Sequence, residues 1–397
     1  MNDIWVFIVA VVFVCLNGLT MLAWAAAQGY KMKPTAFAFM VGAIGNLIAG
    51  SVTPISGQSS ILTVTDRMKN INVRVAALLL AAAVMIPLGM TGAISAIHAW
   101  AGPAVIQGML AGVGMMLVMI CFNMVKSDMR TGIISLVTAL ITWFLFNSSP
   151  VPGVGGPFPT PNALVWVIAI SVGIASIDFA VIRKQRINIK EMAQANGFIG
   201  DMQQNESAKF WTKEYWSDFK IIKPKFGLQT IYFALAFICV NIGTNFAFGG
   251  ITGGMAAGRH GPEYAQNFDH LTIINSIADL PAVIFGGAPI EAIISATALT
   301  RWPVLAGVMV MVVLGILCLV GAVTRIVKFV PATSLAGFLF IIGLFSTFVP
   351  NMTRAMAAGS GEASIAMLVT AISKNPFLGL AAGVIVRYVG PLLGIPV

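Results

Sequence analysis

The segment from Gly286 to Arg301 reads GGAPIEAIISATALTR, and it places one carboxylate, Glu291, within some of the most apolar sequence of the chain. An ionisable side chain inside a membrane-spanning segment is costly, and it is by default a functional-site hypothesis. The Gly-Gly-Ala-Pro run that precedes it breaks regular structure. The rest of the sequence must explain why an acid stands at this depth.

The composition indicates whether lipid or water surrounds most of the chain. Of the 397 residues, 58% are hydrophobic and only 9% are charged. Apolar runs of about twenty residues, the length of a bilayer-spanning helix, recur to the end of the chain. The alternation that a membrane β-barrel requires does not recur. We therefore predict an all-α polytopic membrane protein and exclude a soluble one.

Seven spans are predicted on each side of one long polar segment. Those of the first half are placed at 4–28, 34–50, 52–66, 73–97, 103–125, 131–147 and 162–182. Those of the second half are placed at 227–248, 269–286, 287–300, 302–324, 331–349, 357–373 and 376–395. The first run has neither a basic leader nor a cleavage site, so it is predicted to be a retained span.

The polar segment, residues 183–226, carries nine Lys and Arg against five Asp and Glu. Its part KFWTKEYWSDFK interleaves aromatic residues with lysines, which is typical of an amphipathic helix in the headgroup region. An ordinary linker anchored by aromatics is the simpler interpretation, and a regulatory role is the alternative.

The basic residues predict an orientation in the cell membrane. The connections after spans one, three, five and seven hold sixteen Lys and Arg, and those after spans two, four and six hold none. By the positive-inside rule the basic connections, including the long loop 183–226, are cytoplasmic and both termini lie outside.

A counterpart of the opening segment occurs in the first half. Thr53 to Arg67 reads TPISGQSSILTVTDR, and both segments begin with Pro-Ile, pass through small and hydroxyl residues, and end in Arg. Each is the third element of its seven. Because seven is odd, the two halves run in opposite senses across the membrane, which is the pattern of an inverted-repeat transporter with its site at the repeated elements.

The prolines predict short half-helices at the third and tenth elements. A proline at the first helical position costs no hydrogen bond, and a carboxylate near a helix N-terminus is favoured by the helix dipole. Glu291 would then lie one or two residues inside its half-helix. Opposite it, the third element offers backbone and side-chain donors and acceptors from Ser56, Gly57, Gln58 and Ser59.

From about 241 to 351 the chain resembles the nucleobase–ascorbate transporter family of xanthine and uracil permeases. The resemblance rests on a polar eighth span, the Gly-Gly-then-Glu tenth element, Thr300-Arg301 after it, and Val330-Pro331-Ala332 before a glycine-containing twelfth span.

The resemblance implies fourteen spans in two inverted sevens, and a division into a core and a gate domain. The core comprises residues 1–100 and 227–325, the gate comprises 101–182 and 326–397, and residues 183–226 connect the halves. It also implies a substrate held between the third and tenth elements and spans one and eight, coupling to H+ or Na+, and often a homodimer.

The resemblance assigns site residues by position. Glu291 matches the acid that hydrogen-bonds the substrate, and Gly287 and Ala288 precede it. Where the family usually has another acid on span eight, this chain has Asn241, followed by Thr244 and Asn245. Asn241 and Asn245 share a helix face. An amide both donates and accepts hydrogen bonds, so the substrate's hydrogen-bond pattern is expected to differ.

Two further polar positions have alternative interpretations. Asp279 is either a coupling-ion residue or a structural carboxylate, and Asn17 lies either at the pocket or beside a glycine packing contact. The family normally keeps its termini in the cytoplasm. Either this chain is inserted in the opposite sense, which we favour, or one span has been miscounted.

Several functions are disfavoured by what the sequence lacks. The three histidines are far apart and no metal site is predicted. No nucleotide-binding or nucleophile motif appears, so we expect neither an enzyme nor a cofactor, and no nucleic-acid partner.

Three functions remain open. The first is a secondary active, elevator-type transporter of a small polar heterocycle such as a nucleobase. The second is a carrier of small organic or inorganic anions on the same fold, favoured by two half-helix dipoles and a net charge of +9. The third is a passive channel.

Overall fold

The computed structural model of the protein describes residues 3–57, 68, 70–147, 157–158, 160–189, 191, 213–357 and 361–393. Gln58 and Ser59, predicted as site residues, and the remainder of the third element up to residue 67 lie outside this described part.

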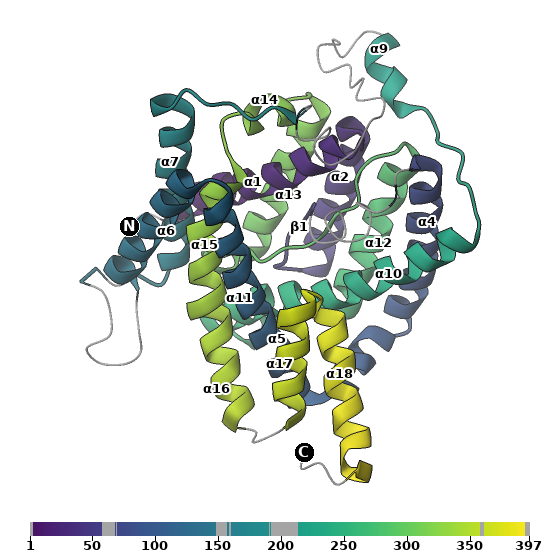
Figure 1. Ribbon diagram of the computed structural model, residues 1–397. Coiled ribbons are helices and arrows are strands. Elements are labelled where there is room, and N and C mark those ends of the chain that lie inside the picture. Colours follow the sequence, from purple (N-terminus) through teal and green to yellow (C-terminus); the bar gives the residue numbers. More distant parts are fainter. Residues whose placement is uncertain are drawn as a thin grey trace.

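The described residues are mainly helical (Figure 1). The helices of the first half are α1 (Asp3–Ala27), α2 (Met32–Ala49), α4 (Ile71–Met90), α5 (Ala93–Ser127), α6 (Met129–Phe146), α7 (Ala163–Ile177) and the π-helix η2 (Asp178–Ile182). The connecting segment contributes α9 (Lys213–Trp216) and the 3-10 turn η3 (Ser217–Phe219).

The second half has more interruptions. Its helices up to the tenth element are α10 (Leu228–Thr244), the π-helix η4 (Asn245–Gly249), α11 (Gly250–His260), the 3-10 turn η5 (Pro262–Tyr264) and α12 (Phe268–Ile284). After the 3-10 turn η6 (Ala296–Leu299) come α13 (Pro303–Leu319), α14 (Val323–Val327), η7 (Ala332–Leu335), α15 (Ala336–Ile341), the π-helix η8 (Ile342–Phe348), α16 (Val349–Ala357), α17 (Gly361–Ser373), α18 (Pro376–Val389) and η9 (Gly390–Leu393). The two strands are β1 (Ile55–Ser56) and β2 (Glu291–Ala292).

Eight helical stretches of the described chain are long and apolar enough to cross a membrane, and three shorter apolar helices accompany them. The prediction of a helical, multi-pass membrane protein is therefore confirmed. The number fourteen stays a prediction. The expected break between spans four and five falls at Gly102, which has φ of 80° inside α5 and is followed by Pro103.

The helix contacts of the first half are repeated in the second. α2 packs on α13, and the corresponding helices α12 and α4 also pack together. The helices α1, α4, α5, α6 and α7 of the first half correspond to α10, α13, α15, α17 and α18 of the second. The contact of α6 with α7 is repeated by α17 with α18, that of α5 with α17 by α15 with α6, and that of α1 with α13 by α10 with α4. The two third elements, β1 and β2, pair antiparallel. The chain therefore has the predicted inverted-repeat architecture.

The spans gather in two groups. α1, α2, α4 and α10 to α14 pack mainly on one another, and α5 to α7 pack mainly with α15 to α18. In Figure 1, β1 lies at the centre of the molecule between α13 and α12, whereas α16, α17 and α18 extend together toward one end. The two strands thus lie inside the first group.

Several connections meet on one side of the molecule. The Lys31 amide donates to Gly286 O at 2.9 Å, the Lys225 amide donates to Asn72 O at 3.0 Å, and the Ile187 amide donates to Lys328 O at 3.0 Å. The Lys225–Asn72 bond joins the segment after α7 to the start of α4, and the Lys31 ammonium donates to Asp218 O of the same segment at 3.0 Å. The connections after α1, after the third element and after α7, which were predicted to share a side, therefore lie together.

The connecting segment is docked on the spans. Asp218, nearly buried in η3, forms an ion pair with the buried Lys33 Nζ at 2.8 Å. Lys33 also lies 4.2 Å from the centre of the Tyr215 ring, and the Tyr215 hydroxyl donates to Leu319 O at 2.6 Å. A buried ammonium group requires such partners. This part of the segment therefore packs against the ends of α2 and α13, and Tyr215 anchors it as the linker interpretation expects. Its position in the headgroup region stays a prediction.

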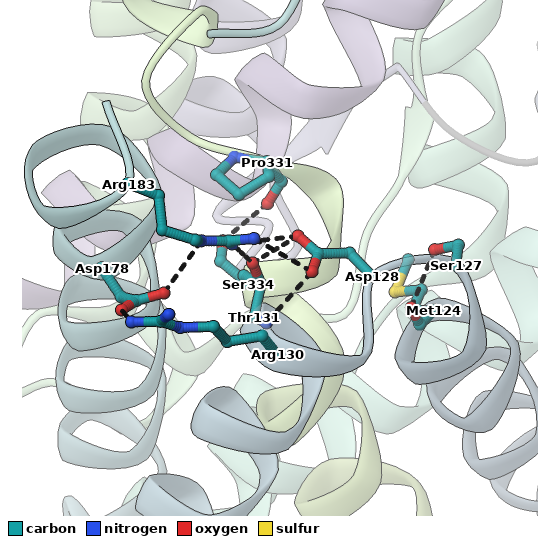
Figure 2. Close-up of polar contacts among 9 residues, drawn as sticks. All are labelled: Met124, Ser127, Asp128, Arg130, Thr131, Asp178, Arg183, Pro331 and Ser334. Carbon is teal, nitrogen blue, oxygen red and sulfur yellow. Dashed lines mark hydrogen bonds and ion pairs between the residues drawn. The ribbon is translucent and has the colours of Figure 1, made fainter. Parts of the chain in front are cut away.

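A cluster of charges joins α5, α6 and α7 at the same side (Figure 2). Arg183 pairs with Asp128 and with Asp178, each at 3.1 Å, and Arg130 pairs with Asp178 at 2.7 Å. Asp128 also accepts hydrogen bonds from the amide and hydroxyl of Thr131, because it caps the N-terminus of α6. The cluster ties the ends of three helices of the second group together.

Candidate functional site

The two repeated elements cross at the centre of the first helix group. Ile55 is paired with Ala292 and Ser56 with Glu291, and all four residues are fully buried. The Ile293 amide extends the pairing by donating to Pro54 O at 3.1 Å. The sequence predicted that these elements face each other across a site, and the structure brings Ser56 and Glu291 together.

The tenth element differs from the expected half-helix. Glu291 is in extended backbone, and the first helical turn, η6, begins at Ala296 with Ser295 as its cap. Pro289 favours extended backbone in the residue before it and carries no N–H to donate. Thr252 on α11 satisfies the next groups, since its hydroxyl donates to Ile293 O at 3.0 Å and accepts from the Ser295 amide at 3.2 Å.

Glu291 lies against the polar face of span eight. The Thr244 hydroxyl oxygen lies 3.4 Å from Glu291 Oε2 and 3.0 Å from Asn241 O, and its single proton can be donated to either acceptor. Immediately after Thr244 the helix becomes the π-helix η4, and π-turns inside α-helices often occur at functional sites. Thr244, predicted as a substrate-binding residue, therefore lies beside Glu291.

Asn245 is brought to the same region but is fully occupied by protein. Its Nδ2 donates to Asn241 Oδ1 at 3.0 Å and to the Thr272 hydroxyl at 2.9 Å. Its Oδ1 accepts from Asn275 Nδ2 at 2.8 Å. With both donors and the acceptor in use, Asn245 fixes α10 and α12 relative to each other. Asn241 and Asn245 share a face, as expected, but they bond to each other.

Asp279 lies beside Glu291 through the backbone. The Ile290 amide, immediately before Glu291, donates to Asp279 Oδ1 at 2.8 Å, and Asp279 is buried. The structure thus shows the structural contact that was one of the two interpretations, and it also places a second acid at the candidate site.

Gly287 and Ala288 lie at the start of the tenth element, where they contact α2. The Ala288 amide donates to the Thr35 hydroxyl at 2.8 Å. A Cβ atom on Gly287 would lie 2.8 Å from the Thr35 amide nitrogen and 2.9 Å from Ala282 O, so only glycine fits this approach. These residues anchor the element, and Thr35 and Thr252 are anchors that the sequence analysis missed.

Span one reaches the crossing through Gly18. A Cβ atom on this glycine would lie 2.9 Å from the Ser56 hydroxyl oxygen. Among the described residues that hydroxyl is buried without a hydrogen-bond partner. Asn17 is half-buried at the preceding position of α1. Gly57 follows β1 and is buried.

A cavity of about 450 Å³ lies between the two helix groups. One wall is formed by η4 and α11, and the other by α5, η8 and α16. Phe246, next to Asn245, belongs to the first wall, and Arg354 and Gln107 belong to the second. The described residues that line the cavity include Arg354 and His98 but neither Asp nor Glu. Sequence reasoning missed this cavity because its residues come from segments far apart in the chain.

No family model matches the chain, and no curated protein matches it. Solved structures do. The transmembrane domain of a cyanobacterium bicarbonate transporter, BicA, matches with 15% identity over 96% of this chain and 98% of that chain, with a TM-score of 0.49. SLC26A9 matches with 13% identity over 96% of this chain and 66% of that one, with a TM-score of 0.50.

The murine SLC26A9 anion transporter in its inward-facing state also matches, with 13% identity over 99% of this chain and 68% of that one, and a TM-score of 0.48. The chain thus spans about two thirds of the length of the SLC26A9 chains. The match to SLC26A9 with a TM-score of 0.50 shows a shared fold. The nucleobase–ascorbate family itself stays a prediction.

Proposed function

We propose that the protein is a secondary active transporter of small anions, in which a coupling cation, H+ or Na+, binds at Glu291 and Asp279. The observation that carries the proposal is the buried crossing of β1 and β2, where Glu291 stands opposite Ser56. Irregular backbone at membrane depth is tolerated where it lines a cavity or is buried in protein, and crossed repeat elements form the substrate site in inverted-repeat transporters.

The charges of the molecule support an anion as the substrate. The cavity between the helix groups carries one cation, Arg354, and no acid among its described lining residues. A cleft lined by one sign of charge concentrates the opposite ion. The two acids at the crossing oppose an anion unless a cation accompanies it, so a cation bound there allows both to be carried together.

We propose an elevator movement for alternating access. In this mechanism the core, residues 1–100 and 227–325, slides against the gate, residues 101–182 and 326–397. The helix contacts support this division, because each group packs mainly on itself. The basic side is proposed to be cytoplasmic, with the termini outside and the protein in the cell membrane, and a homodimer is the proposed assembly.

A nucleobase remains the second candidate. The neighbouring Thr244 hydroxyl and Glu291 carboxylate, and the buried Ser56 hydroxyl, can exchange hydrogen bonds with a neutral heterocycle. A nucleobase carrier would saturate with uracil or xanthine and ignore inorganic anions.

Uptake into proteoliposomes tests both candidates. Radiolabelled bicarbonate, formate, uracil and xanthine are supplied under separate proton and sodium gradients. We expect saturable anion uptake that one gradient accelerates, and loss of this acceleration in Glu291→Gln. Glu263→Gln, which removes an exposed acid of η5, is the matched control. Saturable uptake of a base alone would support the second candidate, and flux without saturation would indicate a channel.

A further inference from the structure

The cavity between the two helix groups contains polar groups that the proposed site at the crossing does not use. Arg354 projects from α16, and within the described chain no acid forms an ion pair with it. A guanidinium group has five N–H donors arranged for planar oxygen acceptors. The cavity therefore offers an anion one exposed cation, which forms no ion pair with a carboxylate of the described residues.

Gln107 supplies a hydrogen-bond acceptor to the same cavity. It lies on α5 in the same cavity lining, and its buried Oε1 has no hydrogen-bond partner among the described residues. Buried polar atoms are almost always hydrogen-bonded, so an acceptor of this kind calls for a donor from a ligand or from water. Arg354 and Gln107 together suit a ligand that is an anion and also carries a hydrogen-bond donor.

The walls near these residues are well defined. The His98 ring packs between Phe246 at 5.2 Å and Phe268 at 4.6 Å, measured between ring centroids. The Asn351 side chain is held by the backbone one turn earlier, because its Nδ2 donates to Thr347 O at 2.7 Å. A volume of about 450 Å³ holds a small ligand together with several water molecules, each of which occupies roughly 30 Å³ in the liquid.

We infer that this cavity is a second ligand site, a vestibule that binds a small oxyanion bearing a hydroxyl or N–H donor through Arg354 and Gln107 before the anion reaches Glu291. This inference rests on the proposed function. Gln107 and Arg354 belong to the proposed gate, and Phe246 and Gly250 to the proposed core. The vestibule would therefore change shape as the two slide, releasing the ligand toward the crossing.

Bicarbonate and nitrate test the site because both are small planar oxyanions of one negative charge and only bicarbonate has a hydroxyl donor. Binding of each to the purified full-length protein is measured by thermal shift titration at one pH. Arg354→Gln is expected to weaken both anions about tenfold, and Arg354→Lys to recover only part of the loss, because an ammonium keeps the charge but not the planar pair of donors. Gln107→Leu is expected to weaken bicarbonate about tenfold and to leave nitrate unchanged.

Arg259→Gln is the matched control, since Arg259 is an exposed arginine in the last turn of α11 and does not line the cavity. Nitrate binding by Gln107→Leu shows that this variant is folded. Unchanged binding in Arg354→Gln, or equal losses of both anions in Gln107→Leu, would overturn the vestibule. If the wild-type protein takes up anions while these variants bind normally, only the vestibule fails. If the wild-type protein neither binds nor carries any anion, the proposed function fails.

Discussion

Ser56 and Glu291 are paired residues of the two antiparallel strands, and neither is exposed. They occupy corresponding elements of the two halves, so the local symmetry of the pairing is also the symmetry of the fold. At this point the symmetry is broken chemically, because one repeat contributes a hydroxyl and the other a carboxylate. Only one of the two strands therefore contributes an acid to the site.

Asp279 distinguishes a coupling role from a structural one. Asp279→Asn keeps an oxygen that can accept from the Ile290 amide but removes the charge. We expect unchanged thermal stability and loss of gradient-driven uptake. Asp279→Ala leaves a buried N–H unsatisfied and is expected to cost about 1–3 kcal/mol of stability. Normal gradient-driven uptake by Asp279→Asn would leave the residue with a structural role only.

Asp218 holds the connecting segment on the spans. Asp218→Asn leaves the buried Lys33 without its carboxylate, which we expect to cost about 3 kcal/mol. Amide hydrogen exchange at 215–222 should then accelerate about a hundredfold, because each 1.4 kcal/mol corresponds to about tenfold. Glu191→Gln, which removes an exposed acid of the same segment, is the control. Unchanged exchange in Asp218→Asn would mean that the aromatic contacts alone hold the segment.

The ionisation of Asp128, on the basic side of the molecule, should make the stability of the protein depend on pH. Burial raises the pKa of this carboxyl, but hydrogen bonds from Arg183 and Thr131 outweigh burial and lower it below its usual value. Its contribution to stability is therefore full above the unfolded-state pKa, about 3.9, and is lost as the pH falls through the lower folded value.

Melting temperatures between pH 3 and 6 measure this effect. We expect Asp128→Asn to melt a few degrees below the wild type at pH 6, and the difference to shrink as the pH approaches 3. The effect is limited because the group is partly exposed. A constant difference over this range would exclude Asp128 as the titrating group.

Gly114 tests the packing inside the second helix group. A Cβ atom there would lie 2.6 Å from both Gly343 O and the Phe348 amide nitrogen, which are backbone atoms. Gly114→Ala is therefore expected to destabilise the protein by about 1–3 kcal/mol and to lower its melting temperature by several degrees. At Gly258, in contrast, a Cβ atom meets nothing within 4 Å, so Gly258→Ala should be neutral or slightly stabilising. Equal melting temperatures would contradict the Gly114 contact.

The sequence predicted the crossing because its signal is local. Two Pro-Ile segments occur at matching positions in the two groups of seven predicted spans, and they can be recognised without tertiary information. The prediction that Ser56 and Glu291 lie at the site follows from these segments. The extended backbone of the tenth element was not predictable in this way. Glu291 stays in a strand because β1 and Thr252 supply partners from elsewhere in the chain.

The same limit applies to side-chain partners. The spacing of Asn241 and Asn245 predicted a shared face, but it could not show that Thr272 and Asn275 occupy the remaining groups of Asn245. The cavity around Arg354 and Gln107 is likewise a tertiary property, since its walls come from α5, α11 and α16. A basic, aromatic segment gave no sign that Asp218 would be buried.

The pairing of β1 with β2 has a consequence for biosynthesis. β1 belongs to the first sixty residues, whereas β2 emerges from the ribosome only after the first half and the connecting segment have been made. Until then the strand edge at Ile55 lacks its partner, and lipid cannot satisfy an open edge. The early part of the nascent chain must therefore be sheltered from the bilayer core, by water or by an insertion factor, until the second half arrives to complete it.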